Sequence, residues 1–355
     1  MKLHPLFILP FAVAACDSDE VATGQAFDDP QVIVDFADEV VVPTYELLAA
    51  RAVSLGEAID ALVENPDEAK LAAARAAWVA ARAPWEQSEG FLFGPVDSLG
   101  IDPALDTWPL NETDLQAVLD SSDTLTAAYV ANLPDSQKGF HALEFLLYGD
   151  SGSRTAAELT ARQRDYLAAI AGDFEIQTAR LASSWTDGEG GLGAYRDLFA
   201  TAGPGNAAYP SLSSAAQEIV SGMAGICDEV ANGKIADPFD ARDPLLEESQ
   251  FSHNSLTDFQ NNMRSVENAY LGRVSDAGTS GRGLTTWVAS RDAALDARIK
   301  AEITAAIAAI GEIPGPFSDA ILDNNAAPKI LAAQAAIRTL QTTLEEDLTD
   351  LILGR

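Results

Sequence analysis

Cysteine is almost absent from this chain, and its scarcity limits how the fold can be held together. The 355 residues include two cysteines, Cys16 and Cys227. Cys16 lies at the end of an apolar N-terminal segment with the features of a processing signal, and if it is acylated Cys227 has no disulfide partner. Cys227 is therefore predicted to be a small buried core residue. Packing must hold the fold together.

Basic residues and histidines are also few. Lysine and arginine number 22 against 54 aspartates and glutamates, for a net charge of −32. Nucleic acid and anionic membrane surfaces are therefore poor partners, and most of the acidic residues are expected to serve solubility. Of three histidines, His4 is removed with the signal, which leaves His141 and His253. Any metal site must then depend on carboxylates and other oxygen donors.

Alternating strand patterns are missing, whereas alanine, leucine and apolar residues at helical spacing are abundant. This composition predicts an all-α protein. Flexible residues 201–206 suggest a boundary between an N-terminal helical lobe, 31–203, and a C-terminal helical lobe, 204–355. The turns near Asn65 and Pro314 resemble each other faintly, so a duplicated bundle remains an open alternative.

The N-terminus is predicted to be a lipoprotein signal peptide over residues 1–15. Val13-Ala14-Ala15-Cys16 resembles a bacterial lipobox, which implies cleavage before Cys16 and lipidation of that residue. Acyl chains would anchor the protein to a membrane of the bacterial cell envelope, facing the periplasm. Residues 16–30 are acidic and polar, and they are predicted to be a flexible tether. An ordinary secretory signal is the alternative.

The most informative motif lies in an apolar segment that is predicted to be a buried helix. His141 and Glu144 are three residues apart, so they project from one helix face and could give two ligands to one metal ion. A buried Glu144 needs a partner, and a cation is one answer. The alternative is a hydrogen-bonded structural pair. Glu86 and Glu89 repeat the same spacing beside the aromatic Trp85.

A second unusual segment, residues 247–272, is too polar for a simple packing helix. It contains Ser252, Asp258, Asn262 and Arg264, several of which would face water on an ordinary surface helix. These residues are candidate site-lining groups, together with Arg82 and Trp85 of the first half. Arg282 follows in a glycine-containing loop and is a further candidate.

Three segments together resemble the imelysin family, also called the M75 peptidase or insulin-cleaving metalloproteinase family, which includes iron-regulated protein A. Residues 139–144 match its Gly-x-His-x-x-Glu motif, and residues 85–95 and 251–272 are similar to its other characteristic segments. The resemblance implies two helical lobes with the site between them. It also implies that His141 and Glu144 bind metal, and that Glu86 and Glu89 face the site.

Three functions are compatible with these features. The first is an iron-handling envelope lipoprotein, with iron as the expected metal, zinc as the alternative, and metal-uptake proteins as possible partners. The second is an M75-type metallopeptidase, although position 145 is Phe and the His-Glu-x-x-His zincin pattern is absent. The third is a binding module for a glycan or a metal chelate, in which Arg264 and Arg282 would meet acidic ligand groups.

Overall fold

The computed structural model describes residues 25–355 and confirms the all-α fold, with 71% of the chain helical. The predicted signal peptide and Cys16 lie outside these described residues. A two-stranded antiparallel ribbon, β1 (Arg273–Val274) and β2 (Thr279–Ser280), is the only sheet in residues 25–355. Among the described helices, none combines the length and the apolar character needed to cross a lipid bilayer.

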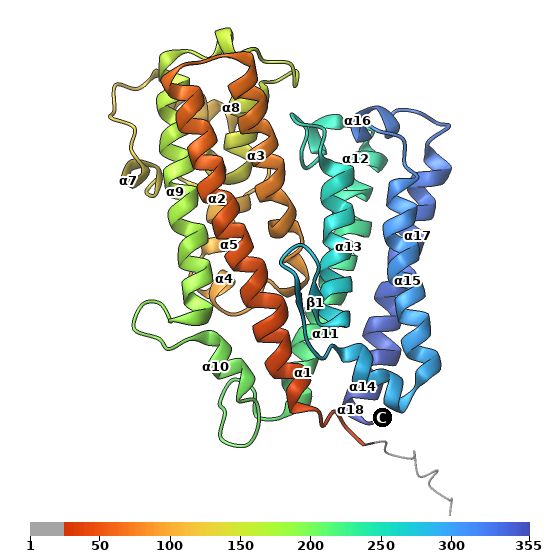
Figure 1. The fold of residues 1–355 in the computed structure, drawn as a ribbon. Coiled ribbons are helices and arrows are strands. Elements are labelled where there is room, and N and C mark those ends of the chain that lie inside the picture. Colours follow the sequence, from red (N-terminus) through yellow and green to blue (C-terminus); the bar gives the residue numbers. More distant parts are fainter. Residues whose placement is uncertain (1–24) are drawn as a thin grey trace, which may run out of the picture.

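The first half of the chain forms one bundle (Figure 1). Its long helices are α2 (Val42–Glu64), α3 (Glu68–Glu86), α8 (Gly139–Tyr148) and α9 (Ala161–Thr186). Shorter elements connect or cover them: α1 (Pro30–Asp35), η1 (Phe36–Val41), η2 (Glu89–Phe91), α4 (Pro95–Ser98), α5 (Ile101–Asp106), α6 (Glu112–Asp120), α7 (Ala127–Val130), η3 (Asp135–Gln137), η4 (Ala156–Glu158) and α10 (Tyr195–Ala200). The helices α3 and α8 carry the predicted site motifs.

The second half forms another bundle beside the first (Figure 1). Its long helices are α11 (Leu212–Glu229), α13 (Ser255–Leu271), α15 (Ala293–Gly311) and α17 (Ala327–Thr343). The shorter elements are η5 (Val230–Lys234), α12 (Ala236–Ala241), η6 (Pro244–Leu246), α14 (Leu284–Arg291), α16 (Phe317–Ala320), η7 (Leu344–Leu348) and α18 (Thr349–Leu353). Alanine-rich sequence runs through residues 284–310 but forms two helices, because Asp292 ends α14 and caps α15 by accepting from two backbone N–H groups.

The two bundles meet where η2 packs against α11 and α13. A side chain at position 222 of α11 could not be accommodated there, since a Cβ on Gly222 would lie 2.3 Å from the carbonyl oxygen of Gly90. Helix α13 also packs against α3 of the first bundle and α15 of its own. Because other helices pack against several sides of α13, its polar residues Asp258, Asn261 and Asn262 are buried.

The start of the described chain is held against the second bundle. Phe27 is buried, and its backbone N–H donates to the carbonyl of Ile352. Asp28 accepts a hydrogen bond from the Trp287 indole and pairs with Arg291. Residues 27 and 28 were assigned to the flexible tether from the sequence, and these contacts instead attach them to the fold.

Candidate functional site: a buried carboxylate cluster between the bundles

The first residue of helix α8, Gly139, has a backbone conformation and a close contact that only glycine tolerates without strain. Gly139 has a φ of +73°, and a Cβ at this position would lie 2.2 Å from the carbonyl oxygen of Leu105. Its absence lets the start of α8 lie directly against the end of α5. This contact brings His141, two residues further on, beside Asp106 at the last position of α5.

His141 and Glu144 face one another, as their spacing predicts, and both contact other protein groups. The Nδ1 atom of His141 is 3.4 Å from Glu144, and its Nε2 atom is 3.1 Å from Asp106. The other Glu144 oxygen accepts from the backbone N–H and hydroxyl of Ser252, at 2.8 and 2.6 Å. The pair therefore connects α8 to α5 and to the second bundle.

The densest collection of carboxylates in the described chain lies next to this pair. Four residues each place one carboxylate oxygen within 4.8 Å of the others: Glu86, Glu89, Asp106 and Glu248. We call these four residues the carboxylate cluster. Glu86 and Glu89 come from the end of α3 and from η2, whereas Glu248 comes from the second bundle. Both bundles are thus needed to form it.

Arg82 holds the buried side of the carboxylate cluster. Its guanidinium is completely buried and lies 2.6 Å from Glu86 and 2.9 Å from Glu248, and it also pairs with Asp106. Asp258 lies 3.7 Å away on the α13 side. One buried arginine thus faces four carboxylates, with Trp85 donating to Asp106 from the same helix.

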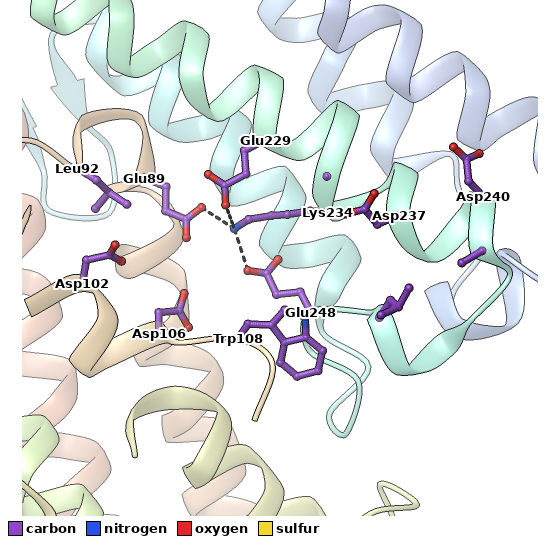
Figure 2. A pocket seen from close by; sticks show the side chains of 13 residues that line it. Glu89, Leu92, Asp102, Asp106, Trp108, Glu229, Lys234, Asp237, Asp240 and Glu248 are labelled. Carbon is purple, nitrogen blue, oxygen red and sulfur yellow. Dashed lines mark hydrogen bonds and ion pairs between the residues drawn. The ribbon is translucent and has the colours of Figure 1, made fainter. Parts of the chain in front are cut away.

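Lys234 lies on the pocket side of the carboxylate cluster, at the end of the π-helical turn η5 (Figure 2). Its Nζ atom is 2.6 Å from Glu89 and 2.8 Å from Glu248. Glu86 and Glu229 are each 3.8 Å away. Burial alone would lower the pKa of Lys234, but the surrounding carboxylates raise that pKa well above its usual value, so the ammonium form persists.

The carboxylates outnumber the cations around them, and their pKa values show the imbalance. Burial raises the pKa of Glu89 to about 8 against the opposing effect of Lys234. Burial likewise raises the pKa of Glu86 well above its usual range, although Arg82 opposes it. Burial raises the pKa of Asp106 as well, but Arg82 and His141 outweigh it and hold that pKa below normal. The pKa shifts of Glu86 and Glu89 thus have the same direction, towards the protonated carboxyl, and Lys234 and Arg82 oppose that direction.

The carboxylate cluster opens into a cavity of about 710 Å³ that is lined by residues of both bundles. Figure 2 shows carboxylate side chains around this pocket, with Lys234 among them. The outer part carries Glu229, Asp237 and Asp240, all exposed, and the inner part carries Glu89, Asp106 and Glu248 of the cluster. The indole of Trp108 lines the pocket and lies against the His141 ring, with centroids 5.0 Å apart.

The structure brings most of the predicted site residues together. Asn262 donates to Glu86 at 2.6 Å and to Glu89 at 2.9 Å, and Asp258 accepts from Ser249 at 2.6 Å. The group within or bordering the carboxylate cluster comprises Arg82, Trp85, Glu86, Glu89, His141, Glu144, Ser252, Asp258 and Asn262.

Two predicted arginines and one histidine lie elsewhere. Arg264 contacts Asn261 and lines a separate cavity of about 290 Å³, and Arg282 is exposed and contacts Asp29 and Asp35. Arg264 misses the cluster because it is two residues beyond Asn262 and so projects from another side of α13. His253 is exposed, and its ring forms a hydrogen bond with Ser318.

Sequence reasoning missed four residues of the site: Asp106, Trp108, Lys234 and Glu248. Asp106 and Trp108 fall in a segment dense in turn residues, where they resemble loop residues. Lys234 follows a regular amphipathic helix, and Glu248 is one of many acidic side chains. The only available signal was that residues 247–258 are unusually polar beside Phe251, which indicates buried polar groups.

A pH prediction follows from His141. Burial alone would lower its pKa, but Asp106 and Glu144 raise that pKa to about 9. The folded state therefore binds this proton more tightly than the unfolded state, so the stabilisation is complete below pH 6.5 and is lost as the pH rises through about 9. Glu89 acts in the same direction, because its raised pKa makes ionisation above pH 5 unfavourable to folding.

We therefore expect the melting temperature to fall between pH 6 and pH 9, with each unit of raised pKa worth about 1.4 kcal/mol. Circular dichroism melting curves measure this slope. His141→Gln should flatten it, whereas His253→Gln should leave it unchanged. A melting temperature that stays constant or rises over this range in the unmodified protein would contradict the prediction.

The fold and the site together place this protein in a class of all-helical proteins that have two bundles and a buried carboxylate cluster between them. The chain belongs to the imelysin family, whose sequence model matches residues 41–344. It is 36% identical over 328 residues to iron-regulated protein A of Synechococcus elongatus, covering 92% of this chain and 88% of that protein. The predicted family is therefore confirmed.

Solved structures show the same fold. A crystal structure described as an iron-regulated protein A precursor, from Parabacteroides distasonis, has a TM-score of 0.82 and 27% identity, covering 92% of this chain and 94% of its own. An imelysin-like protein from Psychrobacter arcticum has a TM-score of 0.68 and covers 92% of this chain and 97% of its own. At 13% identity, the second likeness concerns the fold alone.

Proposed function

We propose that this protein binds a metal ion, with iron as the first candidate, at the carboxylate cluster and handles it at the bacterial cell envelope. The observation that carries the proposal is the placement of four carboxylate oxygens within 4.8 Å of one another, with three of the four residues lining the inner end of an open pocket. Iron-regulated protein A, a relative covering most of the chain, supports iron as the metal.

The residues of the cluster fit a cation. A buried oxygen of Glu248 and the Oδ1 atom of Asn262 have no hydrogen-bond partner in the described chain. The raised pKa values of Glu86 and Glu89 mean that a metal ion would replace protons, as well as an ammonium group, when it binds. Glutamate and aspartate oxygens suit iron, manganese and other oxygen-preferring ions.

In this proposal His141 and Glu144 act beside the ligands of the cluster. Within the described chain His141 lies between two carboxylates, and its raised pKa keeps it protonated at neutral pH. To coordinate a metal it would have to lose that proton. The imidazolium orients Asp106, and Glu144 holds Ser252 of the second bundle, so both bundles stay aligned around the metal.

We also propose that the protein acts at the periplasmic face of a membrane. A lipid at Cys16 would anchor the protein to the envelope, and the acidic rim of the pocket would collect cations from the periplasm. Proteins of metal uptake are the corresponding partners.

Mass spectrometry of the membrane fraction tests the anchor, since a diacylated or triacylated N-terminal Cys16 has a distinct mass. A mature N-terminal peptide that starts elsewhere would count against lipidation.

The double variant Glu86→Gln/Glu89→Gln is expected to lose metal binding. Each substitution keeps the shape and removes one ligand charge, so affinity for Fe²⁺ should fall by roughly a hundredfold or more. Calorimetry under anaerobic conditions, together with metal analysis of the purified protein, measures this. Glu57→Gln, on the exposed face of α2, is the matched control and should bind as the unmodified protein does.

The variant His141→Gln distinguishes two roles of His141, orienting Asp106 or binding the metal ion directly. If His141 only orients Asp106, this variant should retain about one equivalent of metal with roughly tenfold weaker affinity. If it is itself a ligand, binding should be lost as completely as in the double variant. Equal binding by the unmodified protein, the double variant and the control would remove the carboxylate cluster as the site.

A further inference from the structure

Lys234 occupies the place between the carboxylates that a metal ion would take. Its Nζ atom lies 2.6 Å from Glu89, 2.8 Å from Glu248 and 3.8 Å from Glu86. A metal ion bonded to the same oxygens would lie about 2.0–2.6 Å from each. The ammonium group and a metal ion would then almost coincide, so they cannot occupy the cluster together.

The two cations of the cluster differ in whether they can leave it. Arg82 is completely buried, and carboxylates of both bundles surround its guanidinium. Lys234 retains 11% exposure of its side chain and lines the open pocket. Its side chain has a flexible four-carbon stem, whereas the guanidinium plane of arginine is rigid. Lys234 is therefore the cation that can move out.

We propose that Lys234 is a built-in competitor for the metal, a residue that fills the empty cluster and has to be displaced before a metal ion binds. This inference rests on the proposed function of the cluster. In the empty protein the ammonium group lies against Glu89 and Glu248 and favours their ionised forms. On metal binding those carboxylates become ligands, and Lys234 turns into the pocket.

The outer pocket offers the displaced ammonium group a new set of partners. Glu229 is already 3.8 Å from Nζ, and Asp237 and Asp240 of α12 line the same cavity (Figure 2). All three are exposed, so pairing with them needs little desolvation. The ammonium group can thus leave the cluster without becoming an unpaired buried charge.

Competition by an ammonium group also selects among metal ions. A monovalent ion brings the same charge as the group that it displaces, so the exchange gains no Coulomb energy. A divalent or trivalent ion brings more charge to the same carboxylates, and in a buried site this difference is large. Lys234 therefore favours multivalent ions over Na⁺ and K⁺, which are far more abundant.

The first test is Lys234→Met, which keeps an unbranched side chain but removes the charge. Affinity for Fe²⁺ under anaerobic conditions and for Mn²⁺ should increase roughly tenfold or more by calorimetry, and the metal-free protein should melt at a lower temperature. Lys329→Met is the matched control, because Lys329 is exposed and pairs only with Glu312 among the described residues. It should change neither quantity.

The second test uses the unmodified protein, so it does not depend on the folding of a variant. Lysines are acylated briefly with acetic anhydride in the presence and absence of saturating Mn²⁺, and the extent at each position is measured by peptide mass spectrometry. Displacement should expose Lys234 and raise its acylation severalfold, with Lys329 unchanged. Equal or lower acylation of Lys234 with the metal would overturn the inference.

The outcomes separate this inference from the proposed function. If the unmodified protein binds metal and Lys234→Met binds with the same or lower affinity, Lys234 is no competitor while the cluster remains a metal site. If neither protein binds any of the tested ions, both the inference and the proposed function are wrong. If only Lys234→Met binds, the competitor role is supported in its strongest form.

Discussion

Arg82→Met is expected to destabilise the protein by about 3–5 kcal/mol, because it removes one partner of a buried charge network. The substitution leaves Glu86, Asp106 and Glu248 in the interior without the guanidinium that they contact. Burial already raises the pKa of Glu86 in the presence of Arg82. Without the arginine, the carboxylates must either bind protons or separate the bundles.

Urea denaturation followed by circular dichroism measures this effect. Arg196→Met provides the control, since Arg196 forms a close pair with Asp38 near the surface, with both side chains about one-third exposed. Its loss should cost about 1 kcal/mol or less. The Arg82→Met defect should also be smaller at pH 5 than at pH 8, because protonated carboxyls no longer need the cation. Equal costs for the two variants would refute the role of Arg82.

Gly139→Ala is the second substitution with a large expected effect. The new Cβ would lie 2.2 Å from the carbonyl oxygen of Leu105, and the residue would have to keep a φ of +73°. Overpacking against a backbone atom and left-handed strain together should cost about 3 kcal/mol or more. The start of α8 would also move away from α5 and separate His141 from Asp106.

The variant Gly100→Ala distinguishes the cost of the positive φ from the cost of the close contact with a backbone atom. Gly100 also has a positive φ, +64°, but a Cβ there meets nothing within 4 Å. It should therefore show only the conformational cost, about 1 kcal/mol. Melting curves of the two variants measure the difference, and loss of the pH slope assigned to His141 should accompany Gly139→Ala alone. Similar melting temperatures for both variants would show that the contact with Leu105 can relax.

Much of the fold was predictable from local sequence. The 3.6-residue spacing of apolar residues predicts α2 and α9, and Asp67, a residue type that favours helix N-termini, accepts the backbone N–H of Lys70 at the start of α3. The break at Asp292 is not evident from composition, since alanine-rich sequence continues on both sides of it. Asp292 competes with the helix by bonding the N–H groups of Ala294 and Leu295.

The candidate site was predictable in part, because two of its elements are local. Three-residue spacing places His141 and Glu144 on one helix face, and it keeps Glu89, the first residue of η2, close to Glu86 at the end of α3. Asp106 and Glu248 are separated from them by loops and a bundle boundary, so no periodicity relates them. Arg264 was assigned to the site by its neighbours in sequence, and helix geometry turns it to another side.

The sequence by itself determined that the chain is helical, strongly acidic and poor in histidine, because these properties follow from composition and short-range spacing. It also determined the family, since the family's segments occur in order along the chain. Only the tertiary structure decided which carboxylates meet, and that Arg82 and Lys234 lie among them. The physical reason is that two separately packed bundles form the carboxylate cluster, and across their contact Arg82 of the first bundle pairs with Glu248 of the second and Lys234 of the second pairs with Glu89 of the first.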